Sequence, residues 1–380
     1  MEIHNFAGAL IRMMRLEKNW SQETLAQGIC SVSYLSKIEQ GKAEPNEALY
    51  GLLFEKLGLR WQEAAWHNTL RDDLYEGIFS WDTGYTRSLY KQLEKIWPNE
   101  VLGPCYVDFM VIRAYCKKQP ELIQKDFVPL LNERQSALYR MLQHEHTAAY
   151  QIYPCPLTAF SVAEEAYHVG NYTRALEYLQ MASEQAAREG YVYVQMIAEH
   201  YMVNCYSDMG NLDAMYRHSE ISQRIGRILR EDDLVRTIQY NIAATKAEFG
   251  DYEGAYTYFA SLENPNLMAL HKLAICCEAL GKTNEAFKAL EEAREAEGSD
   301  LQHRMCDLVT YRLEHPDYLS DSAYGQMLMD TFDEIRRNLH AGYARFHLLW
   351  VTQWLTANRQ YRKAYEILND FPGSPAFKLV

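Results

Sequence analysis

Cysteine and histidine are the residues of this chain best suited to bind metals or act as nucleophiles, so their spacing is informative. The eight cysteines form no CxxC pair and no zinc-ligand pattern; they are Cys30, Cys105, Cys116, Cys155, Cys205, Cys276, Cys277 and Cys306. His144 and His146 flank Glu145, but no further cluster of metal-binding residues accompanies them. We therefore expect no metal site, no cofactor and no catalytic site, and we expect reduced, mostly buried thiols.

The start of the chain bears on where the protein works. No apolar run of about 18 residues occurs, and the first twenty residues already carry Glu2, Arg12, Arg15, Glu17 and Lys18. These charges argue against a signal peptide, and the missing apolar run argues against a membrane span. We expect a cytoplasmic protein with no membrane partner.

The first 60 residues predict four short helices, the elements that would position any polar side chains there. Apolar residues of segment 3–18 recur at helical spacing. Ser21 and Ser31 stand where N-caps are preferred, before helices that begin near residues 22 and 32, and Asn46 opens the fourth helix. Gly28 and Gly41 follow the second and third helices, where a positive φ favours glycine. Two short helices joined by a glycine-containing turn predict a helix-turn-helix.

This segment resembles the XRE family of helix-turn-helix domains, which includes the lambdoid phage repressors. Three motifs occur in register within residues 21–59: Gln-x-x-Leu-Ala, Ser-x-Leu-Ser-x-Ile-Glu-x-Gly-Lys and a late Leu-Gly. The resemblance implies that Gln22 contacts a phosphate, and that Val32, Ser33 and Lys37 face base edges in the major groove. It further assigns backbone contacts to Tyr34, Ser36 and Lys42.

The side-chain chemistry agrees with these implied roles. Lys37 can donate to guanine, Ser33 can donate or accept, and Val32 can pack on a thymine methyl group. The resemblance also aligns Arg15 and Glu39 with an interior ion pair between the first and third helices. That pair is expected to be structural, because losing one partner would strand a buried charge.

Charge is unevenly divided along the chain. Residues 1–60 contain seven basic and seven acidic side chains, so the remaining residues carry the whole formal net charge of −13. An acidic body repels DNA phosphates and confines attraction to a small surface. Because one neutral domain would bind DNA weakly, we expect a homodimer.

Beyond Trp61 the chain is predicted to be helical, with an internal repeat. Four similar segments centre on Gly170, Gly210, Gly250 and Gly281, and a weaker copy at 355–368 has Asn358 in the place of the glycine. These segments resemble the tetratricopeptide repeat, in which a glycine and small residues such as Ala175, Ala255 and Ala286 let paired helices approach closely. An all-α fold follows, with the helix-turn-helix domain preceding an α-solenoid. A generic helical bundle is the alternative.

A solenoid of this kind has a concave side formed by the first helix of each pair. Residues three, six and nine positions before each glycine fall along one stripe, and its polar, charged and aromatic members are candidates for binding a peptide: Glu164, Tyr167, Tyr201, Asn204, Ser207, Asn241, Lys272 and Glu278. Asn204 and Asn241 stand out, because an amide both donates to and accepts from a peptide backbone. The alternatives to ligand binding are that these residues form a solvated helix face, or that the asparagines bind a neighbouring helix.

The combined architecture resembles the RRNPP family, peptide-sensing regulators of Gram-positive bacteria of the Rap, Rgg, NprR, PlcR and PrgX types. The expected domains are residues 1–61 for DNA binding, a connector helix at 62–76, and a repeat domain at 77–380 for ligand sensing and dimerisation. Because the repeat spacing is irregular after Gly281, the C-terminal part is expected to serve dimerisation in place of ligand binding. The resemblance implies a transcriptional regulator active in quorum sensing. Its homodimer would bind a short signalling peptide and an inverted-repeat operator in double-stranded DNA.

Two other functions stay open. The repeats could bind a protein partner, as in an anti-activator or a phage-type switch, across a broad interface. They could also act on a response regulator as a phosphatase, which needs a carboxamide or carboxylate presented just before the repeats. No spacing between Asp72 and Glu133 supports that second activity.

Overall fold

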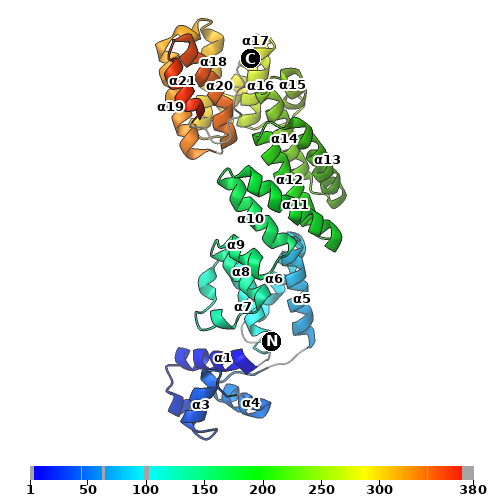
Figure 1. The fold of residues 1–380 in the computed structure, drawn as a ribbon, viewed down its shortest axis with the longest axis vertical. Coiled ribbons are helices and arrows are strands. Elements are labelled where there is room, and N and C mark those ends of the chain that lie inside the picture. The colour runs from blue at the N-terminus through cyan, green and yellow to red at the C-terminus, as the bar shows by residue number, and fades with distance from the viewer. Residues whose placement is uncertain (1–3, 44, 62–64, 98–101, 340, 370–380) are drawn as a thin grey trace. The chain divides into compact units, whose positions relative to one another are not determined.

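The computed structural model describes residues 4–43, 45–61, 65–97, 102–339 and 341–369, and its regular elements there are all helices (Figure 1). This confirms the predicted all-α class. None of the described helices is long and apolar enough to cross a bilayer. The chain divides into two compact units, Met1–Ala198 and Glu199–Val380.

The helix-turn-helix domain consists of α1 (His4–Glu17), α2 (Gln22–Ala26), α3 (Val32–Glu39) and α4 (Glu47–Lys56). The two predicted N-caps are confirmed, and Asn46 proves to be a third: Ser21 accepts a hydrogen bond from the Thr24 backbone nitrogen at 3.0 Å. Ser31 and Asn46 cap α3 and α4 in the same way. Gly28 has a φ of 79°, the left-handed conformation expected at the end of α2.

The first unit continues through helices that support this domain. They are α5 (Ala65–Phe79), α6 (Thr83–Ile96), α7 (Tyr106–Lys117), η1 (Pro120–Leu122), η2 (Val128–Leu130), α8 (Glu133–Leu142), α9 (His146–Ile152), α10 (Pro156–His168) and α11 (Tyr172–Glu189), followed by α12 (Val192–Asp208), which leads into the second unit. The expected connector begins at residues 62–64, outside the described residues. The remainder lies in α5, which runs on to Phe79 and buries Leu74, Tyr75 and Ile78. This helix is therefore part of the packed body, and the boundaries at 61 and 76 stay predictions.

The second unit contains the later helix pairs. They are α13 (Leu212–Leu229), α14 (Asp232–Glu248), α15 (Tyr252–Phe259), α16 (Leu267–Ala279), α17 (Thr283–Glu295), α18 (Asp300–Glu314), η3 (Tyr318–Ser320), α19 (Ser322–Asn338), α20 (Ala341–Ala357) and α21 (Tyr361–Asn369). Consecutive helices return beside one another in pairs (Figure 1). One core joins α14–α21 through large side chains such as Phe259, Phe332 and Trp350.

The repeat glycines lie where paired helices meet, as the sequence predicted. Gly170, Gly210, Gly250 and Gly281 have φ values of 77°, 73°, 86° and 71°, and each lies in the turn between two paired helices. In the second helix of three pairs the small residue is fully buried, at Ala175, Ala255 and Ala286. Close helix approach at a left-handed turn is thus a shared feature of these pairs.

The weaker copy at 355–368 needs a correction. The left-handed residue between α20 and α21 is Arg359, with a φ of 58°, and not Asn358. Asn358 instead uses its side-chain amide to donate to the Leu319 and Trp354 carbonyl oxygens, both at 2.8 Å. The sequence placed Asn358 in the position of the glycine, but its hydrogen bonds hold it beside the last turn of α20, and the left-handed conformation falls on the next residue.

The prediction for the thiols is confirmed in its main point. Six of the eight cysteines are buried, and Cys30 and Cys116 are half-buried. Burial raises the pKa of Cys116 to about 11. The thiols therefore stay protonated at neutral pH.

Candidate nucleic-acid interface and candidate ligand groove

The outer face of α3 carries the residues expected to meet DNA. Val32 is 42% exposed and Tyr34 is 36% exposed, although apolar side chains of this size are usually covered. Ser33 and Lys37 are also exposed, whereas Leu35 and Ile38 on the opposite face are completely buried. The α3 helix thus exposes one row of side chains to solvent while its opposite face is anchored in the core.

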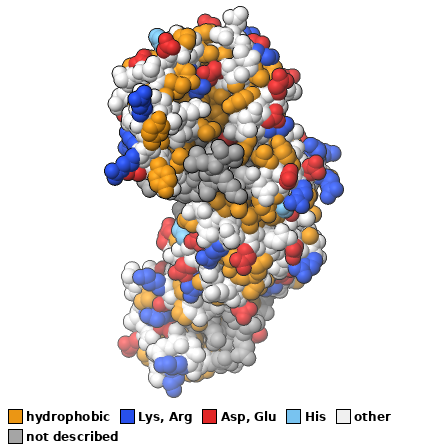
Figure 2. Space-filling model, turned by 45° about the horizontal axis from the view of Figure 1, so that its top comes forward, with side chains coloured by type: hydrophobic (Ala, Val, Ile, Leu, Met, Phe, Trp, Pro, Cys, Tyr) orange, Lys and Arg blue, Asp and Glu red, His pale blue; other side chains and the backbone are white. Residues whose placement is uncertain are grey.

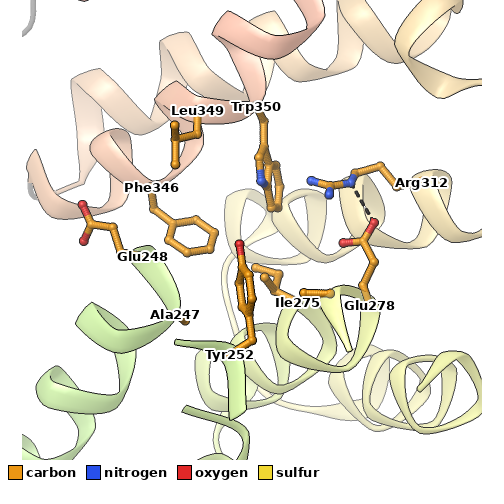
Figure 3. Close-up of a pocket in the computed structure, with 10 residues that line it drawn as sticks. Ala247, Glu248, Tyr252, Ile275, Glu278, Arg312, Phe346, Leu349 and Trp350 are labelled. Carbon is orange, nitrogen blue, oxygen red and sulfur yellow. Dashed lines mark hydrogen bonds and ion pairs between the residues drawn. The ribbon is translucent and has the colours of Figure 1, made fainter. Parts of the chain in front are cut away.

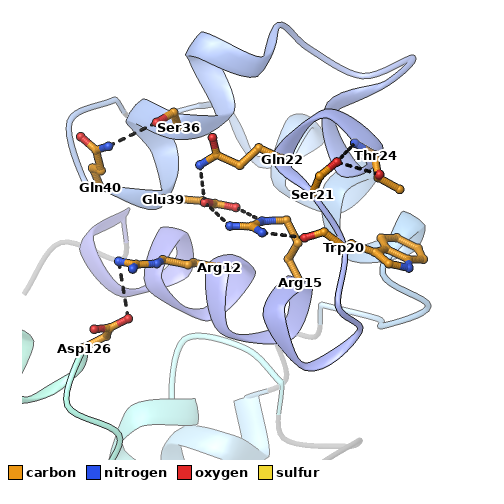
Figure 4. Close-up of polar contacts among 10 residues, drawn as sticks. All are labelled: Arg12, Arg15, Trp20, Ser21, Gln22, Thr24, Ser36, Glu39, Gln40 and Asp126. Atoms are coloured by element: carbon orange, nitrogen blue, oxygen red, sulfur yellow. Dashed lines mark hydrogen bonds and ion pairs between the residues drawn. The ribbon is translucent and has the colours of Figure 1, made fainter.

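A buried ion pair joins α1 to α3 beneath that face. Arg15 donates from Nε to Glu39 Oε1 at 2.6 Å and from Nη2 to Oε2 at 2.9 Å, while Nη1 reaches the Trp20 carbonyl oxygen at 2.7 Å (Figure 4). The side chains are only 8% and 2% exposed. Hydrogen bonding to Glu39 raises the pKa of Arg15. The structural pair expected from the XRE resemblance is confirmed.

Gln22 lies at the first position of α2 and shares the same carboxylate. Its Nε2 donates to Glu39 Oε2 at 2.7 Å, and the side chain is half-buried (Figure 4). An amide nitrogen carries two hydrogens, so one donor remains for a phosphate oxygen. Glu39 therefore fixes the direction of the group that the sequence assigned to a phosphate contact.

The other candidates surround this face. Ser36 is half-buried and accepts a hydrogen bond from Gln40 Nε2 at 3.2 Å, which leaves its own hydroxyl hydrogen free to donate. Lys42 follows α3 and is exposed. Within the described residues, neither Lys37 nor Lys42 forms an ion pair. Acidic and basic side chains are interspersed over the face of the molecule shown in Figure 2.

In the second unit, two of the predicted ligand-binding asparagines meet. Asn241 of α14 donates from Nδ2 to Asn204 Oδ1 of α12 at 3.4 Å, and both side chains are half-buried. A bond of this length is weak, and each amide keeps further hydrogen-bonding capacity. Each asparagine therefore binds a neighbouring helix, as one alternative held, and also keeps polar atoms available to a ligand.

Ser207 lies one turn beyond Asn204 and also bridges the two helices. Its hydroxyl and that of Thr245 are 2.7 Å apart, and Thr245 in turn donates to the Asn241 carbonyl oxygen. Tyr201 lies one turn before Asn204, half-buried, with its ring edge-on to His200. Together these residues form a polar seam along α12 and α14.

A pocket of about 260 Å³ opens where α14, α15 and α16 meet α18 and α20. Its aromatic lining comes from Tyr252, Phe346 and Trp350, and the Tyr252 hydroxyl points toward the space between the other two rings (Figure 3). Ala247 and Glu278, each three residues before a repeat glycine, also line it. The pocket is therefore continuous with the stripe that the sequence predicted.

A partly buried ion pair forms one wall of this pocket. Arg312 of α18 donates from Nε to Glu278 Oε1 at 2.9 Å, with side chains only 13% and 17% exposed. The guanidinium also lies 4.3 Å from the Trp350 ring centre. Burial raises the pKa of Glu278, and Arg312 opposes that shift without cancelling it. The wall thus carries both signs of charge on side chains that are little exposed to solvent.

The remaining predicted groove residues lie deeper or elsewhere. Lys272 is only 4% exposed, with its ammonium 3.5 Å from the Phe346 ring centre, and burial lowers its pKa to about 8. Tyr167 is 8% exposed and packs beside Tyr172. Both side chains are therefore largely covered, and their contact with a ligand stays a prediction. Glu164 is half-buried in α10 of the first unit.

Sequence reasoning missed part of the pocket. Arg312, Phe346 and Trp350 come from α18 and α20, beyond the regular repeats, where the sequence suggested dimerisation in place of ligand binding. The one available signal was composition, because tryptophan and arginine are enriched where proteins bind other molecules.

One carboxamide that precedes the repeats, that of Gln135, is held inside the fold and not presented to solvent. Gln135 of α8 is completely buried and donates from Nε2 to Asp108 Oδ1 at 2.6 Å. The same oxygen accepts from the Tyr75 hydroxyl at 2.8 Å. Among the described residues, no group of three or more histidine, cysteine, aspartate or glutamate side chains could hold a metal ion.

Comparison with known proteins places the first domain in a family. Residues 11–63 match the family model described as Helix-turn-helix. No protein with a curated description is similar in sequence to the chain.

Two solved structures align with most of the length of the chain. NprR in complex with its cognate peptide NprX is 14% identical, with 81% of this chain and all of that one covered and a TM-score of 0.49. PlcR of Bacillus thuringiensis, in complex with the peptide PapR7 and DNA, is 12% identical, with 96% and 100% covered and a TM-score of 0.18. Neither TM-score reaches the level that indicates a shared fold over the full length.

Proposed function

We propose that the protein is a transcriptional regulator that binds DNA as a homodimer in the cytoplasm through α3 and whose activity depends on a ligand of its repeat helices. The observation that carries the DNA-binding role is the exposed row Val32, Ser33 and Lys37, set on a face fixed by the buried Arg15–Glu39 pair. No step of this function is catalytic.

Reading of bases would rely on three different contacts. Lys37 can donate to the O6 and N7 atoms of guanine, Ser33 can donate or accept, and the Val32 methyl groups can contact a thymine methyl. Gln22, aimed by Glu39, and Lys42 would bind phosphates on either side and set the register. This division gives specificity to α3 and affinity to its surroundings.

Two copies of the domain are needed for tight binding. Each has no net charge over residues 1–60, and the rest of the chain repels DNA. A homodimer holding its domains about 34 Å apart would place two α3 helices in successive major grooves. The expected operator is an inverted repeat.

Selection of DNA from a random pool by the full chain tests this role. We expect an enriched inverted repeat, and we expect Ser33→Ala and Lys37→Gln to relax the base preference at separate positions, with a loss of roughly tenfold each. Lys91→Gln is the matched control, because Lys91 is exposed on α6 outside the domain. Enrichment of no sequence, or equal effects of Lys37→Gln and Lys91→Gln, would contradict the proposal.

For the ligand we propose a short peptide bound along α12, α14 and α16. Asn204 and Asn241 supply hydrogen bonds that an extended backbone can use whatever its side chains. The neighbouring pocket, with Tyr252, Phe346 and Trp350, has room for one apolar or aromatic side chain of that peptide. A small pocket beside a row of amides suits a peptide better than a broad protein surface.

Such a ligand can regulate DNA binding only if it prefers one arrangement of the dimer. The pocket is built from repeat helices and from α18 and α20, so an occupant contacts both sets at once. Its binding energy can therefore favour one packing of these helices over another. That is the physical route from peptide to operator affinity.

Titration with short peptides encoded beside the gene tests the sensing role. We expect one of them to shift operator affinity or the dimer population, and Asn204→Ala with Asn241→Ala to abolish the shift while leaving DNA binding intact. Gln180→Ala is the control, because Gln180 is exposed on α11 and its amide, within the described residues, bonds only to Glu184, one turn further along the same helix. Specific DNA binding that no peptide changes would point to a protein partner for the repeats.

A further inference from the structure

A separate hollow of about 300 Å³ lies in the first unit among α5, α6 and the end of α7. It shares no lining residue with the α3 face or with the pocket of α14–α20. Three aromatic side chains line it, Trp81, Tyr90 and Tyr115. Small-molecule sites are mostly apolar, with a few placed polar groups, and begin at about this volume. The hollow therefore suits one small ligand.

Its walls are held in place by packing. Trp81 adopts a φ of 61° at the α5–α6 turn, a conformation that costs a bulky residue about 1 kcal/mol or more. Its ring meets Phe160 of α10 edge-on, with 5.0 Å between ring centres. At Gly77 the two helices lie so close that a β-carbon would be 2.5 Å from Thr86 Oγ1. The aromatic floor is thus formed without any ligand.

The rim of the hollow is cationic. Arg87 and Lys118 line it, both are exposed, and within the described part of the chain neither forms an ion pair. The Lys118 ammonium lies 4.3 Å from the Tyr115 ring centre, above the aromatic floor. The nearby carboxylate of Glu94 is already paired with Arg113 and Lys117.

No acidic side chain is among the residues that line the hollow. In a protein whose formal net charge is −13, two unpaired cations beside an aromatic hollow are a local reversal of sign. A negatively charged ligand would find attraction here that most of the surface does not offer. The aromatic hollow therefore favours a ring of the ligand, and the cationic rim favours a negatively charged group of the same ligand.

We propose that this hollow binds a small aromatic monocarboxylate. The ring of the ligand lies among Trp81, Tyr90 and Tyr115, and its carboxylate meets Arg87, whose guanidinium can donate two parallel hydrogen bonds, and Lys118. Burial raises the pKa of the Tyr90 phenol, with a further contribution from the Glu94 carboxylate, so this side chain stays neutral beside the ligand. This site is independent of the peptide and of DNA.

Fluorine NMR of para-fluorophenylacetate with the full chain tests the proposal. The uncharged para-fluorophenylacetamide has nearly the same shape and is the ligand control. We expect the carboxylate to bind about fivefold or more tightly than the amide, the scale expected for charge pairs near a surface. Equal affinity of the two ligands, or no detectable binding at millimolar concentration, would overturn the proposal.

Variants locate the binding. Replacing both Arg87→Gln and Lys118→Gln should reduce the affinity for the carboxylate to that for the amide, whereas Lys91→Gln on the same helix α6 should change neither. Cys116→Phe, which fills the hollow, should abolish binding of both ligands. Retention of full binding by Cys116→Phe would place the ligand elsewhere and refute the site.

Alkylation provides a readout that needs no substitution. Cys116 lines the hollow, and Cys30 is a half-buried cysteine of the helix-turn-helix domain. Saturating para-fluorophenylacetate should slow the reaction of iodoacetamide with Cys116 and leave that of Cys30 unchanged, as measured by peptide mass spectrometry at pH about 9. Unchanged alkylation of Cys116 at saturation would contradict the proposal even if Cys116→Phe fails to fold.

Discussion

Gly8 of α1 faces the backbone of α3 so closely that a β-carbon on it would stand 1.9 Å from the Ile38 carbonyl oxygen. No side chain fits between the two helices at this point. The depth at which α3 sits, and with it the height of its exposed face, is therefore set by a glycine in a different helix.

Replacing Gly8→Ala should destabilise the helix-turn-helix domain. The added methyl group must push α1 away from α3, and overpacking of this kind costs about 1–3 kcal/mol. Hydrogen exchange of α1 and α3 amides measures the loss as faster exchange. Gly51→Ala in α4 is the control, because nothing lies within 4 Å of its β-carbon position; alanine there should be neutral or stabilising by about 0.5–1 kcal/mol. Equal effects of the two substitutions would contradict the close contact.

Glu39→Gln should be more damaging than a comparable change at the surface. It removes the charge that accepts hydrogen bonds from Arg15 and Gln22, and it leaves the buried guanidinium without a counter-charge. Breaking a buried pair from one side costs about 3–5 kcal/mol. Thermal unfolding and hydrogen exchange of α3 should both report the loss, whereas exposed Glu55→Gln should shift neither. A stable Glu39→Gln variant would mean that water reaches Arg15.

Salt dependence should separate phosphate contacts from base contacts. Lys42→Gln removes one proposed phosphate partner, so the slope of log affinity against log salt should flatten by about 0.9 for every DNA sequence. Ser33→Ala removes no charge and should leave the slope unchanged while altering preference for one base pair. Fluorescence anisotropy on specific and scrambled duplexes measures both. A changed slope for Ser33→Ala would show that α3 is not seated as proposed.

The free energy of unfolding should rise more steeply with pH in the protein that has Lys272 than in a variant that lacks this lysine. Burial lowers the pKa of Lys272 from 10.5 to about 8 in the folded protein. Between these values the unfolded chain binds a proton that the folded chain has released, so the folded state gains as the pH increases.

The matched comparison is Lys272→Met against Lys288→Met, whose lysine is 79% exposed on α17. The stability advantage of Lys272→Met at pH about 7 should shrink by up to about 3 kcal/mol as the pH approaches 10. Urea denaturation at several pH values measures it. If the difference in unfolding free energy between Lys272→Met and the unsubstituted protein does not change with pH, the Lys272 ammonium is solvated.

Arg359→Gly should stabilise the last helix pair. Arg359 holds a left-handed φ of 58° where the other pairs have glycine, and that conformation costs a residue with a β-carbon about 1 kcal/mol. Exchange of α21 amides should slow accordingly. Asn358→Gly, one residue earlier, should accelerate exchange because it removes the hydrogen bonds to Leu319 and Trp354.

Local features of the fold could be predicted from the sequence because they depend on neighbouring residues. A serine before a helix caps it, and a glycine after a helix turns left-handed, as Ser31 and Gly250 do. The Arg15–Glu39 pair was also predicted, although it spans 24 positions, because the XRE resemblance supplied a known arrangement. Where the cue was a single residue type, at Asn358, the register was wrong by one.

The candidate groove was harder to predict because it depends on packing between distant helices. Asn204 and Asn241 were found from the repeat period, yet their mutual hydrogen bond was not. Arg312 pairs with Glu278 across 34 positions, and Phe346 lies over Lys272 across a longer interval still. Periodicity within one helix places a residue on a face, but it cannot say which other helix covers that face.

The polar seam of α12 and α14 allows these two helices to separate on one side at little energetic cost. Direct links between the two helices there include the Asn204–Asn241 and Ser207–Thr245 hydrogen bonds. Each exchanges with water or a ligand at a net cost of about 1 kcal/mol, whereas separating buried alanines would expose apolar surface. The helices can therefore part on the polar side at a low force constant while the apolar side acts as the pivot. A ligand of modest affinity can supply the work of that opening, so sensitivity need not come at the expense of a stable repeat core.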